Sequence, residues 1–234
     1  MIDLRVNGQR YQVESEGRRL LAAGCGGSSG DSAATTQEST GSTGTTTTAV
    51  VGADGCTDVA VPPAREDGGA TAPKERLDPE KTYRLVFDTN CGTFTVTLDL
   101  KSAPATAASL VSLAKSGFYD NTIFHRIVPG FVIQGGDPTQ SGNGGPGYQT
   151  VDPPSSDARY VKGVVAMAKT ATEPAGTSGS QFFVVTGADV GLPRIVGTVT
   201  DGIPVVMRIG KLGDSTTEKP TRPVVVKSVT VEEQ

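Results

Sequence analysis

The chain has 234 residues, a net charge of −4 and an isoelectric point near 5.1, so its charge gives no reason to expect nucleic acid or an anionic membrane surface as a partner. Gly and Pro supply 30 and 15 residues, which favours a fold rich in turns and strands over a helical bundle. His125 is the only histidine, which excludes a metal or catalytic site built from several histidines.

The first 27 residues contain two patterns. Residues 2–13 predict a short hairpin with its turn near Asn7-Gly8. Residues 18–27, RRLLAAGCGG, are similar to the end of a bacterial lipoprotein signal, in which a small residue precedes a cysteine that becomes lipidated. The apolar run from Leu20 to Ala23 is shorter than the roughly 7–15 residues of a secretory signal.

Cys25 is therefore a lipidation candidate, and the alternative is an ordinary cysteine in a Gly-rich tail. The first interpretation predicts an extracytoplasmic protein that is secreted or held at a membrane through lipid. The second leaves a cytoplasmic protein. No apolar run approaches the roughly 18 residues that a membrane span requires.

Residues 26–77 predict a disordered linker. They are rich in Gly, Ser, Thr and Pro and hold few large apolar residues, so they bury too little surface to offset the entropy lost on ordering. We expect the ordered domain to begin near Asp78 and to continue to residue 234.

The pattern of this domain is one of short strands with two helices. Residues 83–87 and 93–98 predict a hairpin, and a helix follows from Pro104 to the residues before Gly117. Further strands are expected at 163–168, 181–185, 195–199 and 223–231, with a second helix at 203–209 and a long surface loop at 138–157. We therefore predict an all-β fold, an antiparallel barrel in which closure removes exposed strand edges, together with two α-helices.

Residues 124–137, FHRIVPGFVIQGGD, place Arg126 and Gln134 within an apolar stretch. A guanidinium and an amide among Phe, Val and Ile cost desolvation energy unless their hydrogen bonds are used. This is the first indication of a site. The alternative is an edge strand from which Arg126 reaches water.

The three cysteines suggest one disulfide. If Cys25 carries lipid, Cys56 and Cys91 remain as a pair that an exported protein can oxidise. Such a bridge would contribute roughly 3–4 kcal/mol in the chain-entropy model, and the alternative is two free thiols. No Cys or His spacing typical of a zinc site is present.

Three blocks of the sequence resemble, in the right order, the motifs of the cyclophilin-type peptidyl-prolyl cis/trans isomerases: 124–137, 163–168 (GVVAMA) and 179–183 (GSQFF). The resemblance covers about residue 80 to the C-terminus. It implies a closed eight-stranded antiparallel barrel capped by two helices. It also implies isomerisation of Xaa–Pro bonds in proline-containing polypeptides during protein folding, without a metal or cofactor. We expect a monomer.

The resemblance also implies residue roles. Arg126 would donate a hydrogen bond to the proline nitrogen in the twisted state, and Gln134 would hold the substrate carbonyl or orient Arg126. We interpret His125 as structural, because the reaction requires no proton transfer. The apolar pocket for the proline ring would be formed by Phe131, Val132 and Phe183, with Leu192 at its rim. Gln181 would contact the peptide backbone, and Ala168 and the backbone of Lys169 would receive the residue before proline.

Residues 187–197 depart from the family pattern. This segment is about three residues short and lacks the His, Tyr or Trp that the family carries there. One wall of the pocket would then be thin, which predicts weaker catalysis and poor binding of cyclic-peptide inhibitors such as cyclosporin. The same departure motivates the rival hypothesis of a non-catalytic proline-peptide binding module or chaperone on the same barrel.

Overall fold

The computed structural model describes residues 2–6, 9–13, 51–152, 161–170, 172–187 and 195–234, and the chain divides into two compact units. In the first unit, Met1–Thr48, β1 (Ile2–Val6) pairs antiparallel with β2 (Gln9–Val13), which confirms the predicted hairpin. Cys25 lies outside the described residues. The second unit, Ala49–Gln234, contains everything that follows.

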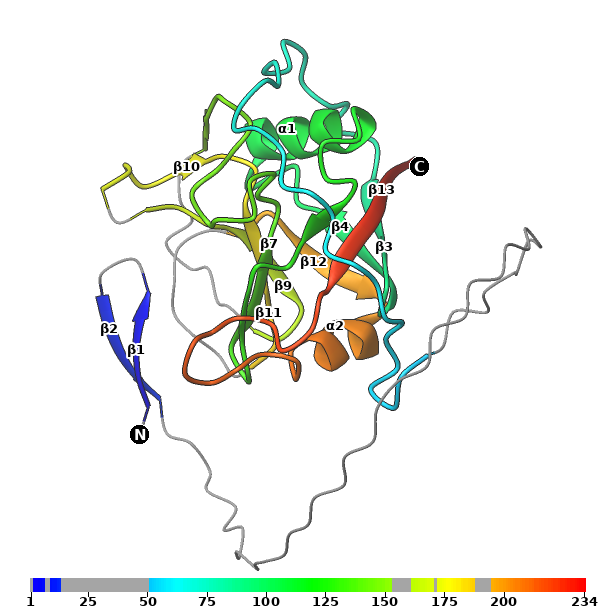
Figure 1. Ribbon diagram of the computed structural model, residues 1–234. Coiled ribbons are helices and arrows are strands. Elements are labelled where there is room, and N and C mark those ends of the chain that lie inside the picture. Colours follow the sequence, from blue (N-terminus) through cyan, green and yellow to red (C-terminus); the bar gives the residue numbers. More distant parts are fainter. Residues whose placement is uncertain (1, 7–8, 14–50, 153–160, 171, 188–194) are drawn as a thin grey trace, which may run out of the picture. The chain divides into compact units, whose positions relative to one another are not determined.

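The second unit is built on a curled antiparallel sheet with the order β5-β13-β3-β4-β12-β9-β11-β7-β6 (Figure 1). Its strands are β3 (Tyr83–Thr89), β4 (Gly92–Leu98), β5 (Thr122–Ile123), β6 (Arg126–Val128), β7 (Val132–Gly135), β9 (Val164–Met167), β11 (Phe182–Val185), β12 (Gly197–Asp201) and β13 (Val225–Glu233). A separate two-stranded sheet pairs β8 (Thr150–Val151) with β10 (Thr177–Ser178).

The predicted antiparallel barrel with two helices is confirmed, with one difference in the strand count. Nine strands rather than eight join the sheet in the described residues, and one of them is the two-residue β5, which pairs with the first two residues of β13. The ladder has two ends, β5 and β6, so the sheet is curled without a closing strand pair among these residues.

The core of the barrel follows from the alternation along its strands. Every second residue of β3 is buried, and the same holds for the second half of β4. Phe87 stacks on Phe94 with ring centroids 4.8 Å apart, and Phe182 contacts Phe87 at 5.3 Å. The interior is therefore filled by side chains, and polar residues at the alternate positions lie on the outer face.

The two helices, α1 (Pro104–Lys115) and α2 (Ile203–Ile209), lie at opposite ends of the barrel (Figure 1). Pro104 occupies the first turn of α1, where a missing N–H is tolerated. The carboxylate of Asp152 accepts hydrogen bonds from the backbone N–H groups of Ala105 and Thr106 at 3.0 and 2.9 Å, so a residue from the predicted loop caps this helix.

Residues 51–82, which we call the strap, run along the outside of the barrel and are drawn in cyan to turquoise in Figure 1. The structure here differs from the disordered linker expected as far as residue 77. The strap contains few large apolar side chains. Backbone hydrogen bonds, such as the one from Thr57 N to Asn90 O at 2.8 Å, and a disulfide fix it to the barrel instead. The ordered unit therefore starts well before residue 78.

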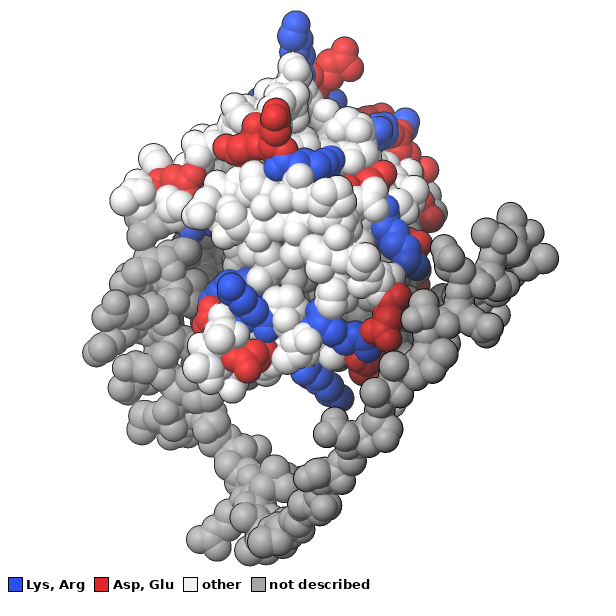
Figure 2. Space-filling model, in the orientation of Figure 1, with Lys and Arg blue, Asp and Glu red and all other residues white. Residues whose placement is uncertain are grey.

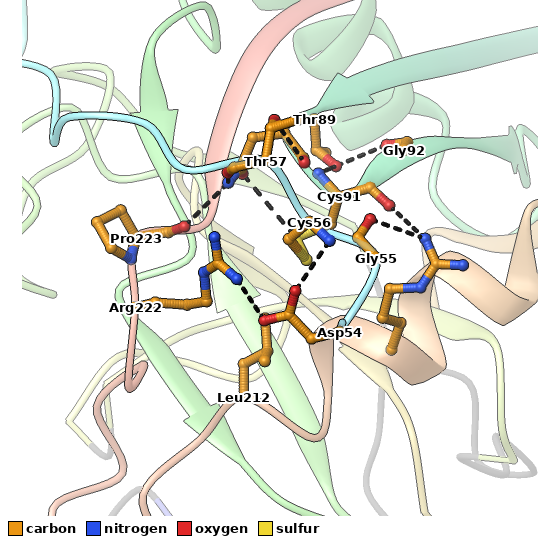
Figure 3. The surroundings of a disulfide bond; sticks show 12 residues. Asp54, Gly55, Cys56, Thr57, Thr89, Cys91, Gly92, Leu212, Arg222 and Pro223 are labelled. Carbon is orange, nitrogen blue, oxygen red and sulfur yellow. Dashed lines mark hydrogen bonds and ion pairs between the residues drawn. A yellow bond between two sulfur atoms is a disulfide. The ribbon is translucent and has the colours of Figure 1, made fainter. Parts of the chain in front are cut away.

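Cys56 and Cys91, the predicted pair, form a disulfide with a Cα–Cα distance of 4.0 Å (Figure 3). Both cysteines are fully buried. Around them, Arg222 forms ion pairs with Asp54 and Asp58, and Arg208 Nη1 donates to Cys91 O at 2.8 Å. The first part of the strap is thus fixed to the β3–β4 turn by covalent and polar contacts.

Figure 2 shows the face over which the strap runs, with charged side chains toward its margins and uncharged residues in its middle. Among the described residues of this face, Lys and Arg do not join into a continuous stripe. No helix in the described part of the chain is both long enough and apolar enough to cross a membrane.

Candidate active site

The site begins with the pairing of β6 and β7. Their register places Arg126 opposite Gln134 and Ile127 opposite Ile133. Ile127 and Ile133 are fully buried in the core, so Arg126 and Gln134 share the outer face of the barrel. The strand period thus resolves the mismatch noted in the sequence, because the apolar residues point inward and the two polar ones point outward.

The next strands extend this outer face. β11 pairs with β7 so that Phe183 lies opposite Gln134, and β9 places Ala166 on the other side of Phe183. Ala168, just past the end of β9, donates its backbone N–H to the carbonyl of Gln181 at 2.9 Å. Four adjacent strands therefore present one continuous surface that carries the predicted site residues.

A chain of side-chain hydrogen bonds crosses this surface. Arg126 Nη1 donates to Gln134 Oε1 at 3.2 Å, and Gln134 Nε2 donates to Gln181 Oε1 at 3.1 Å. Gln181 Nε2 in turn donates to the carbonyl oxygens of Gly142 and Gly144 at 2.9 and 2.8 Å. The orientation of Arg126 therefore depends on a loop that lies two side chains away.

Glu218 holds the opposite side of the guanidinium. Its Oε2 lies 2.6 Å from Arg126 Nε, and its backbone carbonyl accepts a hydrogen bond from Ile127 N at 2.8 Å. Its φ of 58° lies in the left-handed region, which is uncommon for a residue with a side chain. With Nε and Nη1 engaged, Arg126 Nη2 has no hydrogen-bond partner among the described residues.

Glu218 was not predicted from the sequence. It lies 92 residues after Arg126 in a polar turn, and no local pattern connects the two positions. The one available signal was chemical, because a buried or half-buried guanidinium in an apolar strand pair requires a counter-charge.

The apolar part of the site comes from the β6–β7 turn and β11. Phe131 and Val132 are buried, and Phe183 is half-buried on the outer face. Phe131 O accepts hydrogen bonds from the backbone of Thr186 and Gly187, which ties this turn to the end of β11. The three predicted pocket residues thus lie beside Gln134, Phe131 in the turn before β7, Val132 in β7 and Phe183 in the neighbouring β11.

The roles expected for two further residues, the backbone of Lys169 and the side chain of Leu192, stay predictions. Lys169 Nζ donates hydrogen bonds to the carbonyl oxygens of Thr170 and Glu173 at 2.9 and 3.0 Å, so its side chain stabilises the loop that follows β9. Leu192 lies outside the described residues, as does most of the shortened segment. The thin pocket wall predicted for residues 187–197 therefore stays a prediction from the sequence.

His125 and Asp137 lie beneath the 138–147 loop. Neither ring nitrogen of His125 has a hydrogen-bond partner among the residues that the structure describes, and burial lowers the pKa of this histidine despite the attraction of Asp137. Asp137 is fully buried. Burial alone would raise the pKa of its carboxyl, but hydrogen bonds from Thr139 and from the backbone of Gly144 and Gly142 outweigh burial and lower it.

The chemistry available here is hydrogen bonding beside an apolar surface. The guanidinium offers a planar fork of hydrogen-bond donors. In the described part of the chain, no group of three or more His, Cys, Asp or Glu side chains is placed to hold a metal ion. The arrangement is suited to hydrogen bonding a polar, planar group through Arg126 while the adjacent apolar surface binds a small apolar ring.

Comparison with known proteins agrees with this arrangement. Residues 84–231 match the family model described as cyclophilin type peptidyl-prolyl cis-trans isomerase/CLD. Since this match covers more than half of the chain, the protein belongs to the cyclophilin-type peptidyl-prolyl cis-trans isomerase family.

Its relatives include the probable peptidyl-prolyl cis-trans isomerase A of Mycobacterium bovis, 38% identical over 174 residues that cover 65% of this chain and 94% of the relative. Peptidyl-prolyl cis-trans isomerase-like 1 of Aspergillus oryzae is 36% identical over 157 residues, 64% of this chain and 96% of the relative. A crystal structure of a Cryptosporidium parvum cyclophilin type isomerase, determined in the presence of the dipeptide Ala-Pro, matches with a TM-score of 0.56 and 29% identity over 64% of this chain and 98% of that one.

Proposed function

We propose that this protein accelerates the cis/trans isomerisation of Xaa–Pro bonds in polypeptides, with Arg126 as the catalytic residue. The observation that carries the proposal is the anchoring of Arg126. Glu218 and Gln134 hold Nε and Nη1, so that Nη2 remains for a substrate beside the apolar surface of Phe131, Val132 and Phe183. Family membership and the relative studied with Ala-Pro support the same assignment.

The proposed reaction makes and breaks no covalent bond, but it has to lower a high rotational barrier. Rotation about an Xaa–Pro bond is opposed by amide resonance, with a barrier of roughly 18–20 kcal/mol. In the twisted state the proline nitrogen loses conjugation and accepts a hydrogen bond, which the charged fork of Arg126 can donate. No bond is made or broken, so no nucleophile or proton carrier takes part.

One hydrogen bond does not account for catalysis alone. A charge-assisted bond contributes about 1.5–3 kcal/mol, whereas a 10⁵-fold acceleration corresponds to about 7 kcal/mol. The remainder must come from binding the twisted peptide more tightly than either planar isomer. In this account Gln181 and Ala168 hold the peptide backbone and the apolar surface holds the proline ring.

The test is a protease-coupled isomerisation assay on an Xaa-Pro peptide. We expect acceleration by the wild-type protein and its loss in Arg126→Ala. Arg84→Ala is the matched control, because Arg84 pairs with Glu232 at 4.0 Å on the barrel surface away from the site. Peptide binding by the wild-type protein without acceleration would instead support the rival function of a non-catalytic proline-peptide module.

We also propose that the protein acts outside the cytoplasm, in protein folding, and that Cys25 carries a lipid anchor. The support is the signal-like sequence before Cys25 and the Cys56–Cys91 disulfide, since disulfides persist mainly in oxidising compartments. Intact mass of membrane-extracted protein decides this point: we expect a diacylglycerol on Cys25, and a soluble protein with an unmodified Cys25 would contradict the anchor.

We further propose that the protein works as a monomer. Supporting this, the polar network and the apolar surface of the site come from one chain. Sedimentation analysis of the full chain should give one species near 24.0 kDa, plus any lipid. A concentration-dependent dimer would contradict the proposal.

A further inference from the structure

The strap and the 138–147 loop are joined along a short distance by five hydrogen bonds. Three are between backbone groups, from the N–H groups of Arg65, Gly68 and Ala70 to carbonyls of the loop at 2.8–3.1 Å. Two involve side chains: Gln140 Nε2 donates to Pro62 O at 2.9 Å, and Gly145 N donates to Asp67 Oδ1 at 2.7 Å. The loop is therefore held against strap residues 62–70 by contacts along the length of both segments.

The same loop supplies the carbonyls that hold the active site. Gly142 O and Gly144 O both accept hydrogen bonds from Gln181 Nε2, and Gln181 then orients Gln134, which orients Arg126. From Asp67, the connection passes through Gly145 and Gly144 to this amide. Segments 62–70 and 126–134 are thus linked by one uninterrupted series of contacts.

We propose that strap residues 62–70 are a positioning element of the active site: they hold the 138–147 loop so that Gln181 and, through Gln134, Arg126 keep their orientation. The inference rests on the proposed isomerase function and adds residues that lie outside the family match at 84–231. None of these strap residues needs to touch the substrate, so they act on the reaction through the loop.

The composition of the loop explains why it needs an external support. It is rich in glycine, and Gly142 and Gly147 adopt φ values of +88°. Glycine loses more conformational freedom on ordering than any other residue, so this loop is costly to fix in one conformation. From inside, Asp137 fixes it through Thr139 and the backbone of Gly142 and Gly144. From outside, the strap supplies the only hydrogen bonds that the described residues make to Gly145 and Pro146.

The strap is itself anchored on both sides of this contact. Upstream, the Cys56–Cys91 disulfide and the Arg222 ion pairs fix residues 54–58. At the contact, Arg65 donates to Phe118 O and its guanidinium lies 5.6 Å from the centre of the Phe118 ring. Downstream, Leu77 packs against the core. The segment is therefore held firmly enough to fix the loop.

The test variant removes both side-chain links: Asp67→Ala combined with Gln140→Ala. The matched control is Glu66→Ala combined with Asn143→Ala, which changes one exposed residue in each segment and removes no hydrogen bond between them. We expect kcat/KM of the test variant to fall about fivefold, the size expected from about 1 kcal/mol of lost positioning. The control should keep the wild-type value, and Asp67→Asn, which keeps an acceptor oxygen, should stay close to wild type.

A second readout does not depend on activity. The side-chain amide signals of Gln181, assigned by NMR through their loss in Gln181→Ala, should shift in the test variant and remain in place in the control. Amide hydrogen exchange at Gly142 and Gly144 should also become faster in the test variant, which reports loosening of the loop even where thermal stability changes.

The outcomes separate the two proposals. Wild-type protein without isomerase activity overturns the proposed function, and the Gln181 signals and amide exchange then still decide the positioning role. Active wild-type protein with a test variant whose kcat/KM, Gln181 signals and exchange rates all equal those of the wild type overturns the positioning role alone.

Discussion

At the scale of single residues, the site depends on how Arg126 is held. Its guanidinium carries one ion pair and one amide contact, from Glu218 and Gln134, on two sides of the same planar group. A planar fork with fixed donors loses little freedom when a substrate binds, which is the advantage of Arg over Lys at such a position. Glu218 is therefore as much part of the site as the residues with recognisable motifs.

We expect Glu218→Ala to lower kcat/KM about fivefold. The Arg126–Glu218 pair is partly exposed, with side chains 23% and 32% accessible, so its contribution should be near 1 kcal/mol rather than the larger value of a buried pair. The measurement is the isomerisation rate at fixed temperature together with the melting temperature. Glu232→Ala serves as control, and equal rates for Glu218→Ala and the control would contradict this role.

His125 should make stability depend on pH. The pKa of the folded state lies below the usual value of about 6.5, because burial disfavours the charged ring. The unfolded chain therefore binds a proton that the folded chain does not, and stability falls as pH drops from about 6.5 toward the lowered folded pKa. Above about 6.5 the ring is neutral in both states, so His125 causes no loss of stability there.

Chemical denaturation at pH 7.5 and 5.5 tests this point on the wild type and on His125→Phe, whose ring has a similar shape. We expect the wild type to lose more stability than the variant between the two pH values. An identical loss in both proteins would show that His125 titrates alike in the folded and unfolded states.

At the scale of elements, regular strands and helices could be predicted from the sequence, and irregular segments could not. The hairpin of β3 and β4, helix α1 and the strands of the three motifs carry local periodicity, which is legible without knowledge of the contacts. The two-residue strands β5, β8 and β10 have no period to read. They exist because distant partners complete their hydrogen bonds.

The strap illustrates the same limit. Its composition is that of a linker, and composition was the basis for expecting disorder as far as residue 77. Its order comes from one disulfide and from backbone bonds to a loop about 75 residues further on, such as Arg65 N to Pro138 O. The predicted cysteine pair was the one signal in the sequence that this segment touches the barrel.

Removing the disulfide should destabilise the ordered unit. We expect Cys56→Ala combined with Cys91→Ala to lower the free energy of unfolding by roughly 3–4 kcal/mol, since the bridge closes a loop with a sequence separation of 35. Denaturant titration of both proteins under non-reducing conditions measures the difference. A variant as stable as the oxidised wild type would contradict a structural role for the bridge.

The 138–147 loop should depend on an ionised Asp137. Its carboxyl has a lowered pKa in the folded state, so its stabilising contribution is present above the unfolded pKa of about 3.9 and disappears as pH falls through the folded value. We expect Asp137→Asn to be less stable than wild type at pH 7, and the difference to shrink below about pH 4. A difference that stays constant down to pH 2 would contradict the assignment.

At the scale of the whole ordered unit, the candidate site lies on the outside of the barrel and the apolar core lies inside. Phe87, Phe94 and Phe182 fill the interior, whereas Arg126 and Gln134 lie on the outer face. A site on an outer face is accessible to an extended or partly folded polypeptide, which a cavity inside the barrel would exclude. The order of the motifs predicted this candidate site, whereas the contacts of Glu218 and of the strap are visible only in the three-dimensional structure.

The central claim is that Arg126 acts as an anchored fork of donors, and Arg126→Lys tests it most directly. The measurement is the cis/trans exchange rate of an Xaa-Pro peptide, determined by NMR exchange spectroscopy with catalytic amounts of protein. A lysine keeps the charge but cannot bond Glu218, Gln134 and the substrate with fixed geometry at once. We predict that the lysine variant loses most of the wild-type acceleration; a variant that exchanges the peptide as fast as the wild type would contradict the account.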